Sequence, residues 1–489
     1  MVNGTGVNKE REELYAIRNR YALIEDALSG ESAVKARTTT YLPTPNDVSG
    51  SAADRTARYD AYILRAVYYN MVKPTQDALV GQLFLRPPKV TLPDSMAAME
   101  NDVNGEGLGI EQLIRRAANH VLPYGRCGFL ADFPRTDGAV TQADVNAGVR
   151  PIVRFFEPWN IINWQTRKVA NECKLTLLVL REALEVALPS NEFDVEVEHR
   201  FRVYRLTGNA VTVEVWADDE VVEAERPVVD SKGVALTEIP FQFVGSENND
   251  AEMDEPPLYS MAVMNIAHYR NSADYEESVF LVGQPTPVYA GLTADWVENY
   301  FESGIPFGSR ASIPLPENAT AQLLQAMPNT LAFEAMTHKE QQMIAIGARL
   351  INPKATVERK EKEIQIEAAS QRSVLTTIKD NLEKGFVDCL KKAALFVDAS
   401  EDEIELELND NFDLTALTGD EIRSITELYT ARLTSFKAVH ENLRRSGIVK
   451  DTADEAQAEI LADMAFRKQV EPVEPTANPN SKLKEKNNA

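Results

Sequence analysis

The chain has 489 residues, which exceeds one ordinary hydrophobic core and predicts two or more domains. Hydrophobic residues make up 44% and charged residues 26%, as in soluble globular proteins. The formal net charge of −24 opposes tight, general binding to nucleic acids and to anionic membranes, because affinity for phosphates comes from Lys and Arg. It does not exclude DNA that slides past without sticking.

The three cysteines, Cys127, Cys173 and Cys389, lie far apart and form no CxxC pair. They predict neither a disulfide framework nor a zinc site and favour a reducing compartment. The N-terminal stretch lacks the apolar core of a signal peptide, and no apolar run approaches the ~18–20 residues that span a bilayer. We therefore expect no membrane partner.

The N-terminal part reads as helical. Apolar residues repeat at helical spacing over 10–28, and residues 55–86 predict one long helix with a kink at Pro74. A glycine loop, Asn104–Gly109, opens a further helix at about 109–122.

From 149 to about 245 the apolar period changes to two, which predicts a β-rich region with a hairpin turn at 207–209. An acidic loop follows and leads into a mostly helical C-terminal half. Its predicted long helices are 258–282, 331–350 and about 361–397. Between the first two lie the segment PTPVYAG (285–291), a predicted short helix TADWVENYF (293–301) and strand-like stretches around 310–327. The Asn-Pro pair at 352–353 ends the long helix 331–350.

The segment 398–421 is acidic. A capping box from Thr418 to Glu421 predicts the start of a last helix that ends at the SGIV sequence, 446–449. We expect the tail, 466–489, to be disordered because it lacks apolar mass.

A search for catalytic chemistry yields no catalytic residue, no cofactor and no metal site. The sequence has no Gly-Lys dipeptide, no HExxH and no GxSxG, and its five histidines lie in five separate segments. No buried strand precedes Asn104–Gly109, so a tight structural loop is favoured over nucleotide binding there. The acidic clusters at 247–255 and 398–413 lack calcium-loop spacing and favour solvated surfaces. We expect that the protein is not an enzyme.

Seven segments match a known family both in sequence and in order. They are RYDAYILRAVYYNMVKPTQDALVGQLFLRPPKV (58–90), NDVNGEGLGIEQLIRRAANHVLPYGRCGFLADFP (101–134), RPIVRFFEPWNIINW (150–164), PPLYSMAVMNIAHYRNSADYE (256–276), GQPTPVYAG (283–291), residues 344–386 around INPKATVERKEKEIQ, and LRRSGIV (443–449). Over about 55–450 the chain thus resembles portal proteins of tailed bacteriophages, a family known largely as a domain of unknown function.

The resemblance implies an α+β fold: a portal-type subunit with an α/β wing, a helical stem, a small clip with β elements and a helical crown. Mapped by order, residues 1–256 form the wing, and 149–245 are its β-rich part. Two stem helices, 257–282 and 330–350, enclose a clip at 283–329. The remaining parts are a tunnel loop at 351–362, a wing helix at 363–397, a crown at 398–465 and the tail at 466–489.

The resemblance also implies a function and partners. Portal subunits form a homo-oligomeric ring, usually of about twelve copies, at one capsid vertex of the virion, assembled in the host cytoplasm. Double-stranded DNA passes through the channel during packaging and ejection. The expected protein partners are the terminase large subunit, the head–tail adaptor, the major capsid protein and the scaffold. A ring with this subunit charge would have acidic walls that repel phosphates.

Within the implied tunnel loop, four cations are candidates for DNA contact: Lys354, Arg359, Lys360 and Lys362. They would meet the phosphate backbone without reading bases. The alternative is a solvated helix start, because Glu358, Glu361 and Glu363 are interleaved with them. Two other functions stay open: a different head–tail connector or assembly protein of the virion, and a hydrolase with carboxylates that carry no motif.

Overall fold

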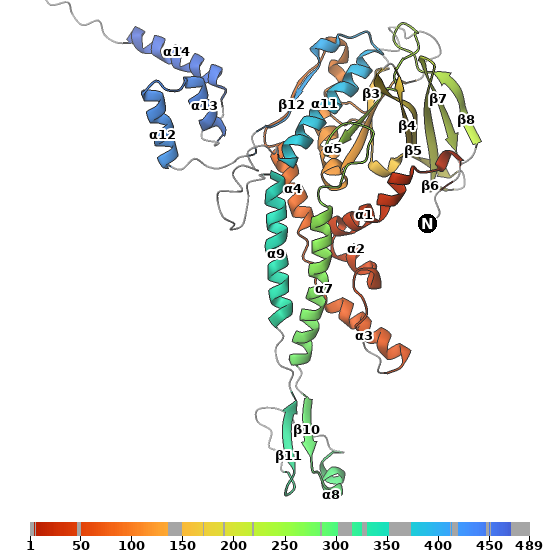
Figure 1. The fold of residues 1–489 in the computed structure, drawn as a ribbon, viewed down its shortest axis with the longest axis vertical. Helices are drawn as coiled ribbons and strands as arrows, with labels where there is room; N and C mark the ends of the chain where they lie inside the picture. Colours follow the sequence, from red (N-terminus) through yellow and green to blue (C-terminus); the bar gives the residue numbers. More distant parts are fainter. Residues whose placement is uncertain are drawn as a thin grey trace, which may run out of the picture. The chain divides into compact units, whose positions relative to one another are not determined.

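A computed structural model describes residues 4, 6–45, 50–134, 149–169, 171–188, 191–217, 220–283, 286–301, 315–324, 330–351, 373–410, 412, 419–445, 449 and 451–470. The chain forms two compact units, residues 1–410 and 411–489, which are described one at a time. Helices and sheets are both extensive, and the fold is α+β as expected (Figure 1).

Short helices build the start of the first unit: α1 (Glu12–Ser29), α2 (Glu31–Ala36), α3 (Ala52–Arg65) and α4 (Val72–Leu83), with 3-10 turns at Gly6–Asn8 and Thr38–Thr40. The single helix expected over 55–86 is wrong. The helix is interrupted at 66–71, and Pro74 lies in the first turn of α4, where its missing N–H needs no acceptor.

A three-stranded antiparallel sheet forms the centre of this unit. Its order is β3 (Ile152–Phe156), β2 (Arg126–Asp132) and β9 (Phe241–Gly245). Helices α5 (Ile110–Tyr124) and α11 (Val374–Ala394) pack against it. Phe129 of β2 and Phe386 of α11 are fully buried and meet edge to face, with ring centroids 5.1 Å apart. Burial of apolar side chains between sheet and helix provides most of the stabilisation here.

A second, five-stranded antiparallel sheet runs in chain order. Its strands are β4 (Ile161–Val169), β5 (Glu172–Leu188), β6 (Asn191–Thr207), β7 (Ala210–Ala217) and β8 (Glu220–Pro227), and a 3-10 turn at Pro158–Asn160 precedes them. The period of two and the turn at 207–209 are confirmed. Gly208 has φ +66° in that turn, a conformation that glycine adopts without steric cost.

A two-stranded sheet ties the segment after α11 to the first unit. Strand β1 (Lys89–Thr91) pairs with β12 (Glu405–Glu407), near 3-10 turns at Asp94–Met99 and Glu401–Glu403. The backbone N–H of Leu408 also donates to the Glu383 carboxylate of α11 at 2.6 Å. Residues 398–410 therefore pack with the first unit, although the order-based mapping groups them with the crown.

Two long helices follow the sheets. Helix α7 (Tyr259–Val282) and helix α9 (Thr330–Ile351) pack side by side, close to the expected positions (Figure 1). Between them in the chain lie the antiparallel strands β10 (Thr286–Ala290) and β11 (Thr320–Leu324), the short helix α8 (Ala294–Trp296) and one π-helical turn, Val297–Phe301. Helix α11 begins at Val374, with the Ser373 hydroxyl accepting from the N–H of Thr376. Residues 361–372 of the expected helix lie outside the described residues.

The second unit contains α12 (Gly419–Thr430), α13 (Phe436–Arg445) and α14 (Ala453–Val470). The sequence predicts one helix from Thr418 to SGIV. The structure instead breaks it at 431–435, where Arg432 has φ +58°, outside the helical region. Helix α14 includes 466–470, which the sequence assigns to a disordered tail, and 471–489 lie outside the described residues. Among the described residues, no helix combines the length and apolar content needed to cross a bilayer.

Candidate functional site

The paired helices α7 and α9 are the candidate functional site, because the resemblance places the stem here. They approach closely at Gly347: a β-carbon there would lie 3.4 Å from the Met261 methyl carbon. His268 is buried on α7, and its Nε2 lies 3.1 Å from Glu340 Oε1 of α9. Further along, the rings of Tyr275 and Phe333 are 6.0 Å apart. Each of the two helices therefore packs against the other along one of its faces.

A buried asparagine fixes α7 to the linker between α3 and α4. The Asn265 side chain accepts from the Met71 N–H at 2.9 Å and from the Tyr68 hydroxyl at 3.1 Å, and donates to the Tyr69 carbonyl at 2.8 Å. The Ser272 hydroxyl likewise accepts a hydrogen bond from the Val67 N–H at 3.1 Å and donates one to the Val67 carbonyl at 2.7 Å. These bonds satisfy backbone groups that the interrupted helix leaves without helical partners.

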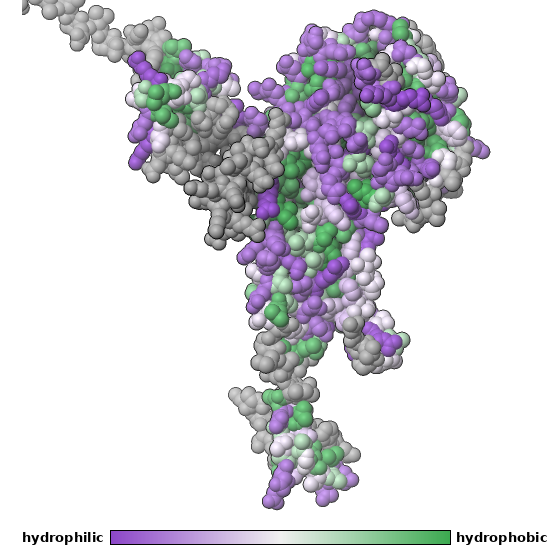
Figure 2. Space-filling view, viewed as in Figure 1, coloured by the Kyte–Doolittle hydropathy of each residue, from purple (hydrophilic) through white to green (hydrophobic). Residues whose placement is uncertain are grey.

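Both long helices carry exposed apolar side chains. Leu331 and Ile344 of α9 are 72% and 60% exposed. Helix α7 exposes Val263, Val279, Phe280 and Leu281. Figure 2 shows hydrophobic residues at the surface along these helices, whereas much of the surface around the sheets is hydrophilic. These exposed apolar side chains are candidates for contact with another chain.

Of the predicted tunnel loop, 351–362, only the first residue is among the described residues. Helix α9 ends at Ile351, and the next described residue is Ser373. Lys354, Arg359, Lys360 and Lys362 lie outside the described residues, and their contact with DNA stays a prediction.

The glycine loop Asn104–Gly109 is a tight structural turn. The Asp102 carboxylate accepts from the N–H groups of Gly105 and Gly107, each at 2.9 Å. The Asn104 side chain accepts from Glu106 and Leu108. A phosphate would need free N–H groups, and here side-chain oxygens of the chain itself occupy them.

The acidic loop 247–255 is folded around internal partners. The Asp254 carboxylate accepts from the Glu247 N–H at 2.8 Å, and burial raises the pKa of Asp254. Arg126 is 2% exposed and donates to the Glu252 carbonyl at 2.8 Å, while its guanidinium lies 4.3 Å from the Trp164 ring centroid. Burial lowers the pKa of Arg126 to about 10. Within the described ranges, no three His, Cys, Asp or Glu side chains are grouped as metal ligands would be.

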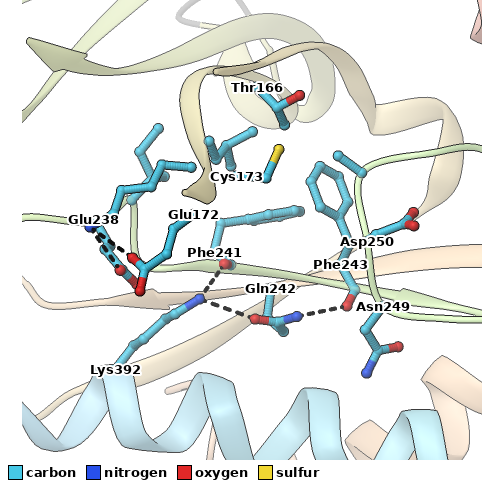
Figure 3. A pocket seen from close by; sticks show the side chains of 14 residues that line it. Thr166, Glu172, Cys173, Glu238, Phe241, Gln242, Phe243, Asn249, Asp250 and Lys392 are labelled. Carbon is cyan, nitrogen blue, oxygen red and sulfur yellow. Dashed lines mark hydrogen bonds and ion pairs between the residues drawn. The ribbon is translucent and has the colours of Figure 1, made fainter. Parts of the chain in front are cut away.

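A cavity of about 440 Å³ lies between the adjoining ends of β4 and β5, the acidic loop and α11 (Figure 3). At its floor the Lys392 amine donates to the Phe241 carbonyl at 2.7 Å and to the Gln242 side chain at 3.1 Å. Burial lowers the pKa of Lys392. At the rim, Lys174 pairs with Glu238 at 3.3 Å. The amines thus serve structural bonds that join α11 and β5 to the segment around β9.

Comparison with known proteins gives a family match over part of the chain. A family model described as a domain of unknown function (DUF4055) matches residues 257–397, from the start of α7 to just beyond α11. No curated protein matches the chain.

Among solved structures, the chain is similar to one in the virion of a native gene transfer agent particle, at 11% identity and a TM-score of 0.39, covering 82% of this chain and 94% of the other. It is also similar to a chain in the neck of an empty gene transfer agent particle computed with C6 symmetry, at 11% identity and a TM-score of 0.39, covering 79% and 92%. A third similar chain belongs to the neck of the native particle computed with C12 symmetry, at 11% identity and a TM-score of 0.38, covering 76% and 89%.

Sequence reasoning missed the residues that position the long helices. Asn265 and His268 carry no motif, and their partners lie about 70 to 200 positions away in the chain. The one local signal is a polar residue at a position where the helical spacing predicts an apolar, core-facing side chain. Such a polar side chain requires a hydrogen-bond partner when it is buried.

Proposed function

We propose that the chain is a structural protein of head–tail connector type in a phage-like particle, and specifically a portal subunit. About twelve copies would form a ring around a channel for double-stranded DNA, located in the virion at one capsid vertex. The ring would bind the terminase large subunit, the head–tail adaptor, the major capsid protein and the scaffold. The protein would have no catalytic activity of its own.

The observation that carries this proposal is the set of apolar side chains exposed on α7 and α9. Each helix packs on the other along one face, yet side chains such as Leu331 and Ile344 remain exposed on the outside. Equivalent helices of neighbouring copies would bury that surface, as in a closed ring with heterologous contacts.

Two further features support the proposal. The seven segments that resemble portal proteins occur in the family's order, and a long helix, a small β unit and a second long helix follow one another as the order-based mapping requires. The net charge of −24 for each copy would give the assembly acidic surfaces along which DNA can slide without being held.

Mass photometry of the purified protein tests the proposal. Because one chain has a mass of 54.4 kDa, a ring of about twelve copies would have a mass of roughly 650 kDa. A stable species near 54.4 kDa under all assembly conditions, together with turnover of a substrate, would contradict the portal assignment.

A further inference from the structure

Lys392 reaches from α11 into the cavity between β4, β5 and the acidic loop (Figure 3). Its amine donates to two neutral acceptors, the Phe241 carbonyl at 2.7 Å and the Gln242 side-chain oxygen at 3.1 Å. Among the described residues, no carboxylate lies within ion-pair distance of this amine. A neutral amine has two N–H groups, so these two acceptors satisfy it. An ammonium group would keep a third N–H and a charge without a bonded counter-charge.

The surroundings of this amine favour its neutral form. Burial lowers the pKa of Lys392, whereas Cys389, Glu238 and Asp388 act in the opposite direction. Burial is the largest of these effects, so Lys392 loses its proton at a lower pH than an exposed lysine does. A neutral amine has a lone pair that can attack an electrophile, and an ammonium group has none. Since both N–H groups are bonded to the protein, the lone pair is left for a molecule in the cavity.

The cavity connects this amine to solvent and favours uncharged molecules. Glu172 and Glu238 at its rim are exposed, so the cavity is open to solvent there. Its volume of about 440 Å³ lies in the range of cavities that hold small molecules. The lining contains three carboxylates, those of Glu172, Glu238 and Asp250, and only one further cation, Lys174. With the floor amine neutral, this excess of negative charge repels anions.

We propose that Lys392 is a covalent modification site for small, uncharged, activated acyl compounds, such as esters and thioesters, that enter this cavity. The amine nitrogen attacks the acyl carbonyl carbon and forms an amide bond. The bond from that carbon to the leaving group breaks, the leaving group departs with the electron pair, and one amine proton passes to solvent. The amide product keeps one N–H for Phe241 or Gln242. The inference does not depend on ring formation, because all of these groups belong to the first unit of one chain.

The probe is the N-hydroxysuccinimide ester of acetic acid, which is uncharged, and it is added to the full-length protein at neutral pH. Peptide mass spectrometry measures the acetylation rate of each lysine. We expect Lys392 to react roughly tenfold faster than the exposed Lys89 and Lys437, because each unit by which a pKa falls gives a tenfold larger neutral fraction. The sulfonated form of the same ester is anionic and should show a smaller preference for Lys392. Equal rates at Lys392 and Lys89, or an equal preference with both esters, would overturn the proposal.

Three variants locate the reaction. Lys392→Arg keeps hydrogen-bond donors on α11 and should abolish acetylation at this position without changing the rate at Lys89. Cys173 lines the cavity and is exposed, so Cys173→Trp places a large side chain in the path from solvent. This variant should slow the acetylation of Lys392 to the rate of Lys89 or below. Cys173→Ser, with a small side chain at the same position, is the matched control and should react like wild type.

Circular dichroism shows whether each variant is folded, and the comparison of the two esters needs only the wild-type protein. A wild-type rate at Lys392 in folded Cys173→Trp would show that the ester reaches the amine by a route other than the cavity. A slow reaction in Cys173→Ser would show that the acyl group passes through the thiol instead of reaching the amine directly. Either result overturns the proposal.

Discussion

Arg202 of β6 and Asp132 at the end of β2 form an ion pair across the two main sheets, with 3.3 Å between Nη1 and Oδ2. The Arg202 Nε also donates to Glu182 of β5 at 3.1 Å, and Arg154 of β3 approaches Asp132 at 2.9 Å. The side chains of Arg202 and Asp132 are mostly buried. This network sets the position of the five-stranded sheet against the three-stranded one.

Replacing Arg202 with Met should destabilise the first unit by about 2 kcal/mol, because the buried carboxylates of Asp132 and Glu182 each lose one of their two arginine partners and keep only Arg154. Urea unfolding followed by tryptophan fluorescence measures the change. Arg200→Met is the matched control. Its pair with Glu198 is more exposed and should contribute less than about 0.5 kcal/mol. Equal effects of the two substitutions would show that the network does not join the sheets.

Gly125 ends α5 in the left-handed region, with φ +76°. A β-carbon there would lie 3.1 Å from the carbonyl oxygens of Asp254 and Glu255. Gly125→Ala should therefore cost about 2–3 kcal/mol in unfolding free energy, from conformational strain and displacement of the acidic loop. Gly208→Ala, with φ +66° and no atom near the new methyl group, should cost only about 1 kcal/mol.

Glu157 contributes pH-dependent stability. The hydrogen bond from His120 holds the pKa of Glu157 below its usual value, and Arg116 adds to this effect. A carboxylate with a lowered folded-state pKa stabilises the protein above the unfolded-state pKa, near 4.5, and this stabilisation is lost as the pH falls through the folded-state pKa. Glu157→Gln should lose about 1 kcal/mol at pH 7. The difference from wild type should vanish in strong acid.

Unfolding at a series of pH values measures that difference. Glu111→Gln is the control, because the pair of Glu111 with Arg115 is exposed on α5 and contributes little. A wild-type-to-Gln difference that stays constant down to acid pH would exclude the linkage.

Ile344→Lys tests the outer surface of the long helices. A charge placed in a buried subunit contact is costly, so the variant should fold as wild type but fail to form the large species in mass photometry. Ala98→Lys introduces the same charge at an exposed position away from α7 and α9 and should assemble normally. Normal assembly of both variants would place the subunit contact elsewhere.

The four cations of the predicted tunnel loop are tested together. Replacing Lys354, Arg359, Lys360 and Lys362 with Ala should leave assembly intact and lower the amount of DNA packaged or retained. The choice of DNA should not change, because such cations meet phosphates and not base edges. A packaging assay with mutant particles measures both quantities. Normal yield at physiological salt would favour the solvated helix start.

Local sequence signals predicted the type of many elements but not every boundary. The period of two over β3 to β7 and the helices α7 and α9 were predicted close to their observed positions, because side-chain alternation and helical spacing are local properties. The interruption at 66–71 was missed. Its backbone partners are Asn265 and Ser272, about 200 residues further along, and no local pattern records them.

The sequence by itself determined the acidic charge, the succession of helical and β-rich regions and the resemblance to portal proteins, since these depend on composition and on order along the chain. Only the tertiary structure decided which polar side chains are buried and what they bind. No local sequence signal predicts the burial of Arg126, yet it lies beneath the acidic loop against Trp164. Val195 lies in a stretch with an apolar period of two, yet its side chain is exposed on β6. Burial of a side chain depends on which distant parts of the chain pack against it. Periodicity identifies the apolar face of a helix or strand but not the element that covers this face.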